Sequence, residues 1–158
     1  MRAEGYSESI IDEFETSRAE HWKSMILNHV DTDGPLKILD VGTGPGFFPI
    51  LLGRDGHRIT AVDYTEAMLE EAEKNCRRYN VSAELSKMDA HSLDFEDDTF
   101  DLILSRNLIW DLENPKKAYA EWLRVLKPDG KMMVFDGNHY LHLYDEDYAD
   151  AHKTGRGE

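Results

Sequence analysis

The sequence predicts an α/β protein in which a doubly wound, mostly parallel sheet of about five strands carries helices on both faces. One observation is the segment Lys37–Val41, an apolar strand that runs into a turn with glycine at alternate positions and then into the apolar segment Phe47–Leu52. Another is Phe100–Ser105, a nearly continuous apolar run that is typical of a central parallel strand buried on both faces. Helical patterns alternate with strand patterns between and after these segments, as a parallel sheet requires.

The elements follow in order along the chain. Ser7–Val30 has apolar residues at spacings of three and four, which predicts one or two helices, and the composition of Asp31–Pro35 predicts a turn. The first strand and the glycine turn come next. The pattern then predicts a helix over Phe47–Arg54, a strand over His57–Val62, a helix from an N-cap at Thr65 to about Tyr79, and a strand over Val81–Met88.

After the strand Phe100–Ser105, Asn114 and Pro115 suit the N-cap and the first position of a helix that ends near Lys127. A Pro-Asp-Gly turn then leads to a fifth strand over Met132–Asp136. The tail has tyrosines at 140, 144 and 148, a spacing that suits one short helix. We expect an N-terminal helical cap at residues 1–34, a core at 35–138 and a short tail at 139–158, all within one domain.

The glycine turn predicts a ligand site. Glycine allows positive φ and close approach of a ligand, and the N–H groups at the start of the next helix are expected to point at whatever is bound. Asp40 precedes the turn at the carboxyl end of the first strand, where open α/β sheets bind ligands. Asp63 ends the second strand, and its carboxylate can accept two hydrogen bonds from the hydroxyls of a ribose.

This turn resembles motif I of the class I S-adenosylmethionine (SAM)-dependent methyltransferases of the type 11 kind, an acidic residue followed by G-x-G-x-G. Here the motif is Asp40, Gly42, Gly44 and Gly46. Two further segments resemble the family: D-x-x-F-D leading into Phe100–Ser105, and LRVLKPDG, which is similar to its LKPGG connection. The resemblance implies a Rossmann-like fold, SAM as cofactor and S-adenosylhomocysteine as product.

The resemblance also implies site residues. Asp63 matches the ribose-binding acid, Asp89 and Ala90 match the pair beside adenine, and the loop from Arg106 to Asp111 matches one that faces the methionine part of SAM and the acceptor. The full cofactor-binding set that we expect is Asp40, Gly42, Thr43, Gly44, Gly46, Asp63, Tyr64, Met68, Asp89, Ala90, Arg106 and Asn107. The N-terminal cap adds Tyr6, Phe14, His21 and Trp22 as pocket-lining candidates, although plain packing also explains them.

Composition limits the partners. The chain has 158 residues and a net charge of −14, which disfavours nucleic acid and anionic membranes as partners. There is also no Asn/Asp-Pro-Pro-aromatic segment after the fourth strand, a segment that the family uses on the exocyclic amines of bases. We find no signal peptide or membrane-length apolar run, so we expect a cytoplasmic protein. Cys76 fits a buried helical position, and the spacing of His139, His142 and His152 matches no zinc pattern, so we expect no metal.

The family fold continues past its fifth strand with a helix and an antiparallel hairpin, whereas only 22 residues follow Asp136 here. The exposed sheet edge is then covered by the tail or paired in a homodimer.

We therefore predict a SAM-dependent methyltransferase that acts on a small molecule by in-line displacement. His91, Asp111 and His139 are candidate bases. The alternatives are a non-catalytic or truncated SAM-binding module, and an NAD-dependent oxidoreductase. NAD is disfavoured because the third glycine of G-x-G-x-x-G would fall at Phe47.

Overall fold

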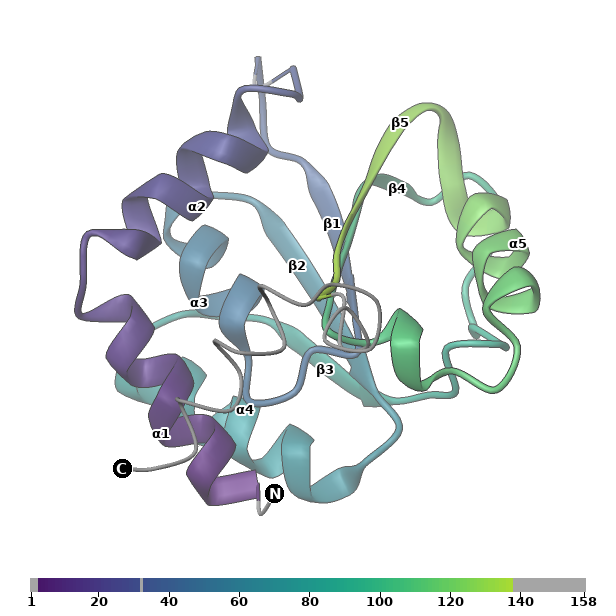
Figure 1. The fold of residues 1–158 in the computed structure, drawn as a ribbon. Helices are drawn as coiled ribbons and strands as arrows, with labels where there is room; N and C mark the ends of the chain where they lie inside the picture. The colour runs from purple at the N-terminus through teal and green to yellow at the C-terminus, as the bar shows by residue number, and fades with distance from the viewer. Residues whose placement is uncertain (1–2, 32, 138–158) are drawn as a thin grey trace, which may run out of the picture.

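A single parallel sheet organises the computed structural model, which describes residues 3–31 and 33–137. Its strand order is β3-β2-β1-β4-β5, so that β1 lies at the centre (Figure 1). The strands are β1 (Lys37–Val41), β2 (Arg58–Asp63), β3 (Glu84–Lys87), β4 (Phe100–Arg106) and β5 (Leu126–Phe135). All neighbouring strands pair in parallel, which confirms the predicted α/β class.

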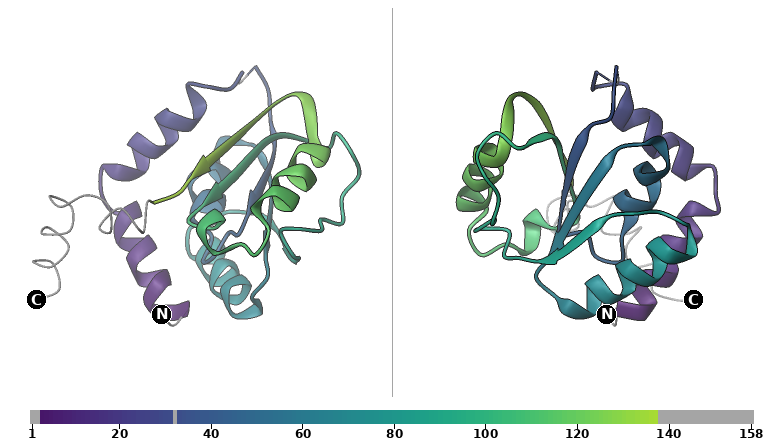
Figure 2. Two further views of the ribbon diagram at one scale, coloured as in Figure 1. Left: turned by 45° about the vertical axis from the view of Figure 1, so that its right-hand side comes forward. Right: turned by 180° about the vertical axis from the view of Figure 1, so that it is seen from behind.

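Helices cover both faces of the sheet (Figure 2). On one face lie α1 (Ala3–Phe14), α2 (Arg18–Leu27), α3 (Phe47–Leu52) and α4 (Glu66–Arg78), and on the other lies α5 (Pro115–Val125). The chain moves outward from β1 through β2 to β3, and then crosses back to β4 and β5. Because parallel crossovers are right-handed, the two directions of travel place their helices on opposite faces. The short 3₁₀ helices η1 (Gly53–Asp55) and η2 (Ile109–Asp111) complete the described elements.

The core is divided by the sheet into two clusters. Ile38, Leu102 and Leu104 point to the cluster that contains Phe47 and Phe48 beneath the N-terminal helices. Leu39, Val41 and Ile103 point the other way, to the cluster that contains Trp122 of α5. Successive residues of β1 and β4 thus enter different clusters, which explains why both strands are apolar without alternation.

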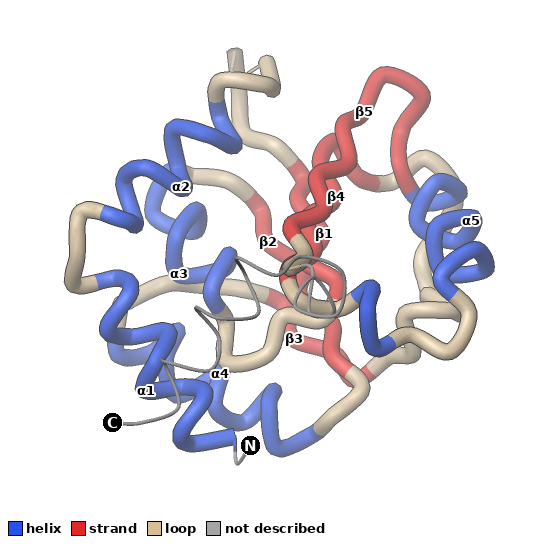
Figure 3. The backbone as a smooth tube through the Cα atoms, in the orientation of Figure 1, coloured by secondary structure: helices blue, strands red, loops and turns tan. Residues whose placement is uncertain are grey.

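The last strand begins earlier than the sequence predicts. Leu126 already pairs with Phe100, and the ladder resumes at Lys131 opposite Leu102, so residues 127–130 form a bulge opposite Asp101. The Asp101 carboxylate accepts hydrogen bonds from Lys127 Nζ and from the Lys37 N–H, both at 2.8 Å. The predicted Pro-Asp-Gly turn is therefore a bulge within a strand and not a loop before it; Figure 3 shows β5 running directly from α5.

Smaller differences concern element ends. The segment predicted to hold one or two helices holds two, separated by residues 15–17, and the helix predicted to Arg54 becomes α3 followed by η1. β3 starts at Glu84, later than predicted. Thr65 occupies the N-cap of α4, but its side chain makes no capping bond; its N–H instead donates to Asp63 Oδ1 at 2.9 Å.

The direction of travel reverses between β1 and β4, so the connections that leave their adjacent carboxyl ends run in opposite directions and leave a crevice. No helix within residues 3–31 or 33–137 has the length and apolar character needed to cross a membrane. The predicted tail helix and the three tail histidines lie outside the described residues, and the boundaries of the cap, core and tail stay predictions.

Candidate functional site

A cavity of about 500 Å³ opens at the carboxyl ends of the first four strands, at the crevice between β1 and β4. Its walls come from α1, the glycine turn, the β2–α4 connection, the segment after β3 and the β4–α5 loop. The predicted residues that line it are Gly42, Gly44, Asp63, Tyr64, Met68, Asp89, Ala90, Arg106 and Asn107. Asp40, Thr43 and Gly46, also predicted, are not among the lining residues.

The glycine turn is shaped by positive φ at all three glycines, with values of 73° at Gly42, 54° at Gly44 and 92° at Gly46. A Cβ at Gly42 would lie 2.8 Å from a Leu108 methyl carbon, and one at Gly44 would lie 3.2 Å from the Tyr6 ring. The absence of a Cβ at both glycines therefore allows Leu108 and Tyr6 to pack closely against the turn. A Cβ at Gly46 would lie 3.3 Å from Ala72 Cα, so this glycine serves the packing of the turn against α4.

The N–H groups of the turn are bound by the protein itself. Gly42 and Thr43 donate to the Val62 carbonyl at 2.9 and 3.0 Å, and Gly46 donates to the Thr43 carbonyl at 3.1 Å. Gly44 donates to Asp63 Oδ2 at 2.9 Å. The N–H groups of Gly42, Thr43 and Gly44 are therefore taken up by β2, and that of Gly46 is taken up within the turn itself. The expectation for the N–H groups at the start of the next helix is a separate one and stays a prediction. A pyrophosphate would lack those donors, whereas a ligand that needs only close approach is accommodated.

Each carboxylate oxygen of Asp63 accepts a hydrogen bond from the backbone. Oδ2 accepts from Gly44 in the glycine turn, and Oδ1 accepts from Thr65 at the start of α4. The carboxylate thus braces the turn against the next helix while it lines the cavity. Carboxylate oxygens can each accept more than one hydrogen bond, so the predicted ribose contact is compatible with the brace.

His91 holds Asp89, one of the two residues that the family resemblance places beside adenine. The N–H and Nδ1 of His91 both contact Asp89 Oδ1, at 2.8 and 2.7 Å, and these bonds lower the pKa of Asp89. The Asn114 N–H lies 3.2 Å from His91 Nε2. Because this N–H can only donate, Nε2 is unprotonated, and Nδ1 carries the hydrogen that goes to Asp89. His91 thus links Asp89 in the cavity lining to Asn114 at the start of α5.

Arg106 links the cavity to the N-terminal helices. Its Nη2 donates to Glu13 Oε2 at 2.8 Å, and its guanidinium lies 4.2 Å from the Phe47 ring centroid and 4.8 Å from that of Trp22. Trp22 Nε1 in turn donates to Glu13 Oε1 at 2.8 Å. The guanidinium is therefore committed to the cap, although Arg106 lines the cavity.

The cap candidates separate clearly. Tyr6 lines the cavity and lies over Gly44. Phe14 and Trp22 pack against the first core cluster, and His21 is exposed. Buried hydrogen bonds help to place Tyr6 through Ser7, the next residue in the chain. Asn75 Nδ2 of α4 donates to the Ser7 hydroxyl at 2.8 Å and to the Pro45 carbonyl at 2.9 Å.

Asp40 lies beneath the site. It is 1% exposed, and neither carboxylate oxygen has a hydrogen-bond partner among the described residues. Burial raises the pKa of Asp40 to about 7, with a smaller upward contribution from Asp63 and an opposing one from the side chain of Thr43. The carboxyl group is therefore partly protonated near neutral pH, which reasoning from the motif alone does not reveal.

Several lining residues were not predicted, namely Val41, Val62, Thr65, Met88, Leu112 and Glu113. Most of them flank predicted residues at strand ends, so the strand pattern could have identified them. Leu108 lies in the loop that the resemblance implies for the site, but its approach to Gly42 depends on how that loop folds.

The candidate bases differ in their surroundings. His91 lines the cavity, but both ring nitrogens are engaged. Asp111 lines the cavity and is exposed. His139 lies outside the described residues.

The chain matches a family described as "Methyltransferase domain" over residues 39–134. It is 30% identical over 120 residues to a demethylmenaquinone methyltransferase of Tropheryma whipplei, an alignment that covers 75% of this chain and 49% of the relative. It is 31% identical over 116 residues to a phosphatidylethanolamine N-methyltransferase of Cereibacter sphaeroides, which covers 71% and 54%. The chain thus spans about half the length of these relatives.

Among solved structures, a putative S-adenosyl-L-methionine-dependent methyltransferase from Methanococcus maripaludis superposes with a TM-score of 0.74. The sequences are 26% identical, and the match covers 97% of this chain and 72% of the other. The described fold therefore corresponds to that protein's fold over nearly the whole chain.

Proposed function

The chain belongs to the class I SAM-dependent methyltransferase family, and we propose that it binds SAM and transfers the methyl group to a small-molecule acceptor. One observation carries the proposal: the cavity brings the glycine turn, Asp63 and the Asp89–Ala90 pair into a single wall. These residues lie at the ends of three different strands, β1, β2 and β3, and could not meet by local sequence alone.

In this proposal the donor half of the cavity holds the nucleoside. Asp63 accepts the ribose hydroxyls with the lone pairs that its brace leaves, and Asp89 with Ala90 receives adenine. Tyr64, which is 71% exposed, and Met68 supply apolar contact at the rim. The acceptor enters beside Tyr6 and the β4–α5 loop, which cover the glycine turn from the other side.

The chemistry requires few catalytic side chains. A sulfonium is already activated for in-line displacement, so the protein contributes alignment and exclusion of water. A base is needed only where the acceptor arrives protonated. Asp111 is then the first candidate, because His91 would have to release the Asn114 N–H before it could accept a proton.

The acceptor class follows from the relatives only as a proposal. One relative is named for demethylmenaquinone and the other for the nitrogen of phosphatidylethanolamine. We therefore place a demethylated quinone and a lipid or small-molecule amine first in an acceptor screen.

The test is calorimetric titration of the purified chain with S-adenosylhomocysteine, with NAD as control. We expect micromolar, one-to-one binding of S-adenosylhomocysteine alone. Binding of NAD instead, or of neither ligand, would contradict the proposal.

A second candidate is a SAM-binding module without catalysis, which the engagement of both ring nitrogens of His91 favours. The two functions separate in an acceptor screen with radiolabelled SAM. Cofactor binding without transfer to quinone, amine, thiol or hydroxyl acceptors would favour the module.

A further inference from the structure

We propose that Trp122 is a positioning residue that sets the base selectivity of the cofactor site, an inference that rests on the proposed function. It does so by fixing the Ala90 carbonyl, so that Asp89 and Ala90 present a fixed acceptor and donor to the purine. Trp122 itself does not line the cavity.

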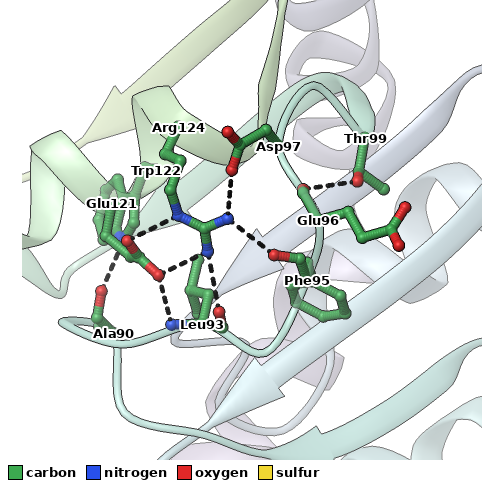
Figure 4. Close-up of polar contacts among 9 residues, drawn as sticks. All are labelled: Ala90, Leu93, Phe95, Glu96, Asp97, Thr99, Glu121, Trp122 and Arg124. Atoms are coloured by element: carbon green, nitrogen blue, oxygen red, sulfur yellow. Dashed lines mark hydrogen bonds and ion pairs between the residues drawn. The ribbon is translucent and has the colours of Figure 1, made fainter.

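The contact is direct and buried. Trp122 Nε1 donates to the Ala90 carbonyl at 2.9 Å, and the side chain of Trp122 is fully buried on α5. Figure 4 shows the indole reaching from α5 to Ala90. Trp122 shares its core cluster with Val41 and Val62, which themselves line the cavity. The indole therefore belongs to a core cluster that reaches the cavity, and it also bonds directly to Ala90 in the cavity lining.

The segment after Ala90 is held to the same helix. Arg124 donates to the carbonyls of Leu93 and Phe95 at 3.0 and 2.8 Å, and Glu121 accepts from the Leu93 N–H at 2.9 Å. Figure 4 shows this group enclosing the Arg124 guanidinium. These bonds anchor the loop beyond residue 92, whereas the bond from Trp122 is the one that reaches Ala90 itself.

The carboxylate of Asp89, which precedes Ala90, is held by His91. Both His91 contacts go to Asp89 Oδ1, so that Oδ2 can accept a hydrogen bond from a ligand. The Asp89 carbonyl accepts from the Ser92 N–H at 2.9 Å, and the Ala90 carbonyl accepts from Trp122 Nε1 at 2.9 Å. The peptide units on both sides of the Ala90 Cα are therefore held, and the N–H of Ala90, which belongs to the first of them, has a defined direction. The wall then offers one acceptor and one donor side by side.

This pair matches adenine and rejects its deaminated form. The 6-amino group of adenine donates and N1 accepts, whereas hypoxanthine presents a carbonyl oxygen and an N1–H at the same positions. Hypoxanthine would place its oxygen against the carboxylate and its N–H against a backbone N–H. Rejection of this kind depends on polar groups that cannot turn away, so it requires the bond from Trp122.

The experiment compares the affinities of S-adenosylhomocysteine and S-inosylhomocysteine in three proteins. These are the wild type, Trp122→Phe, and Val125→Ala as the matched control. Val125 is fully buried on the same helix and in the same core cluster, but it has no side-chain hydrogen bond to lose. The readout is the ratio of the two affinities, which a general loss of stability does not change.

We expect Trp122→Phe to lower the preference for the adenosyl ligand by about 5- to 10-fold, and Val125→Ala to leave it within about twofold. An unchanged ratio in folded Trp122→Phe would overturn the inference. If the phenylalanine variant does not fold, a benzothienyl analogue of tryptophan at position 122 keeps the ring shape and removes only the donor. Failure of the wild type to bind S-adenosylhomocysteine would overturn the proposed function, whereas normal binding with an unchanged ratio would overturn this inference alone.

Discussion

Removal of the Asp63 side chain should have two separable effects, one on stability and one on cofactor binding. In Asp63→Ala the N–H groups of Gly44 and Thr65 lose the carboxylate that accepts both of them at 2.9 Å. Hydrogen bonds to a charged group contribute about 1.5–3 kcal/mol each, and these two are only partly shielded from water. We expect the free energy of unfolding to fall by about 2–4 kcal/mol, which is roughly 4–12 °C in Tm for a chain of this size.

Binding should fall in addition to stability. Loss of the proposed ribose contacts and of the fixed Gly44 backbone should weaken S-adenosylhomocysteine by about 1–3 kcal/mol, or 5- to 150-fold in Kd. Asp63→Asn keeps one acceptor oxygen and turns an amide N–H₂ toward the other donor, so it should be intermediate in Tm. Glu66→Ala is the control, because Glu66 is an exposed carboxylate in the same region, 3.8 Å from Lys87 and not in contact with the glycine turn.

The assays are thermal unfolding for the brace and calorimetry at a temperature where each variant is folded for the binding. A Tm for Asp63→Ala equal to that of Glu66→Ala would refute the brace. An unchanged Kd in the folded variant would remove Asp63 from the cofactor site.

Three further experiments test the glycine turn, the buried Asp40 carboxyl group and the buried Cys76 thiol. Gly44→Val should lower the free energy of unfolding by about 1–2 kcal/mol because of its φ of 54°, and it should weaken the binding of S-adenosylhomocysteine at least about tenfold because the new side chain meets Tyr6. Gly56→Ala is the control: its φ is 80° and it lies in open space, so it should show the backbone cost with normal binding. Asp40 is protonated in the folded state up to about pH 7 but ionises near 3.8 when unfolded, so it makes the free energy of unfolding fall as pH rises from about 4 to 7. Chemical unfolding across this range should show a smaller fall in Asp40→Asn than in the wild type. An equal dependence of the free energy of unfolding on pH in the two proteins would contradict the raised pKa. Burial raises the pKa of the Cys76 thiol to about 11, so an aromatic disulfide reagent at pH 8 should react with Cys76 only as the protein unfolds. Rapid reaction with the native chain would place Cys76 at the surface.

Local pattern was sufficient for much of the fold. Periodicity located β1, β2 and β4 and the helix that Asn114 caps, where the Asn114 side chain accepts the Lys117 N–H at 3.1 Å. It missed the start of β5, because the pairing of Leu126 with Phe100 depends on a ladder between distant segments. No local signal distinguishes a bulge of four residues from a turn before a strand.

For the site, the sequence located positions better than contacts. The carboxylate of Asp63 lies where the motif predicts, but its bond to Gly44 depends on the path of the turn. Arg106 lines the cavity as expected, but the sequence does not predict its bond to Glu13, which is 93 positions away. Such contacts are set by how α1 packs across the sheet end, and a strand-by-strand pattern does not contain that information.

The central place of β1 has a consequence for the order in which the protein folds. β1 pairs with β2, where residue 37 meets residue 58, and also with β4, where residue 38 meets residue 102. The first pairing closes a short loop and the second a long one, so the unit from β1 to β3 can assemble before β4 docks. The cavity lies across the boundary between β1 and β4, which pair later, so it is complete only near the native state. A ligand bound there should slow unfolding and leave the rate of folding almost unchanged.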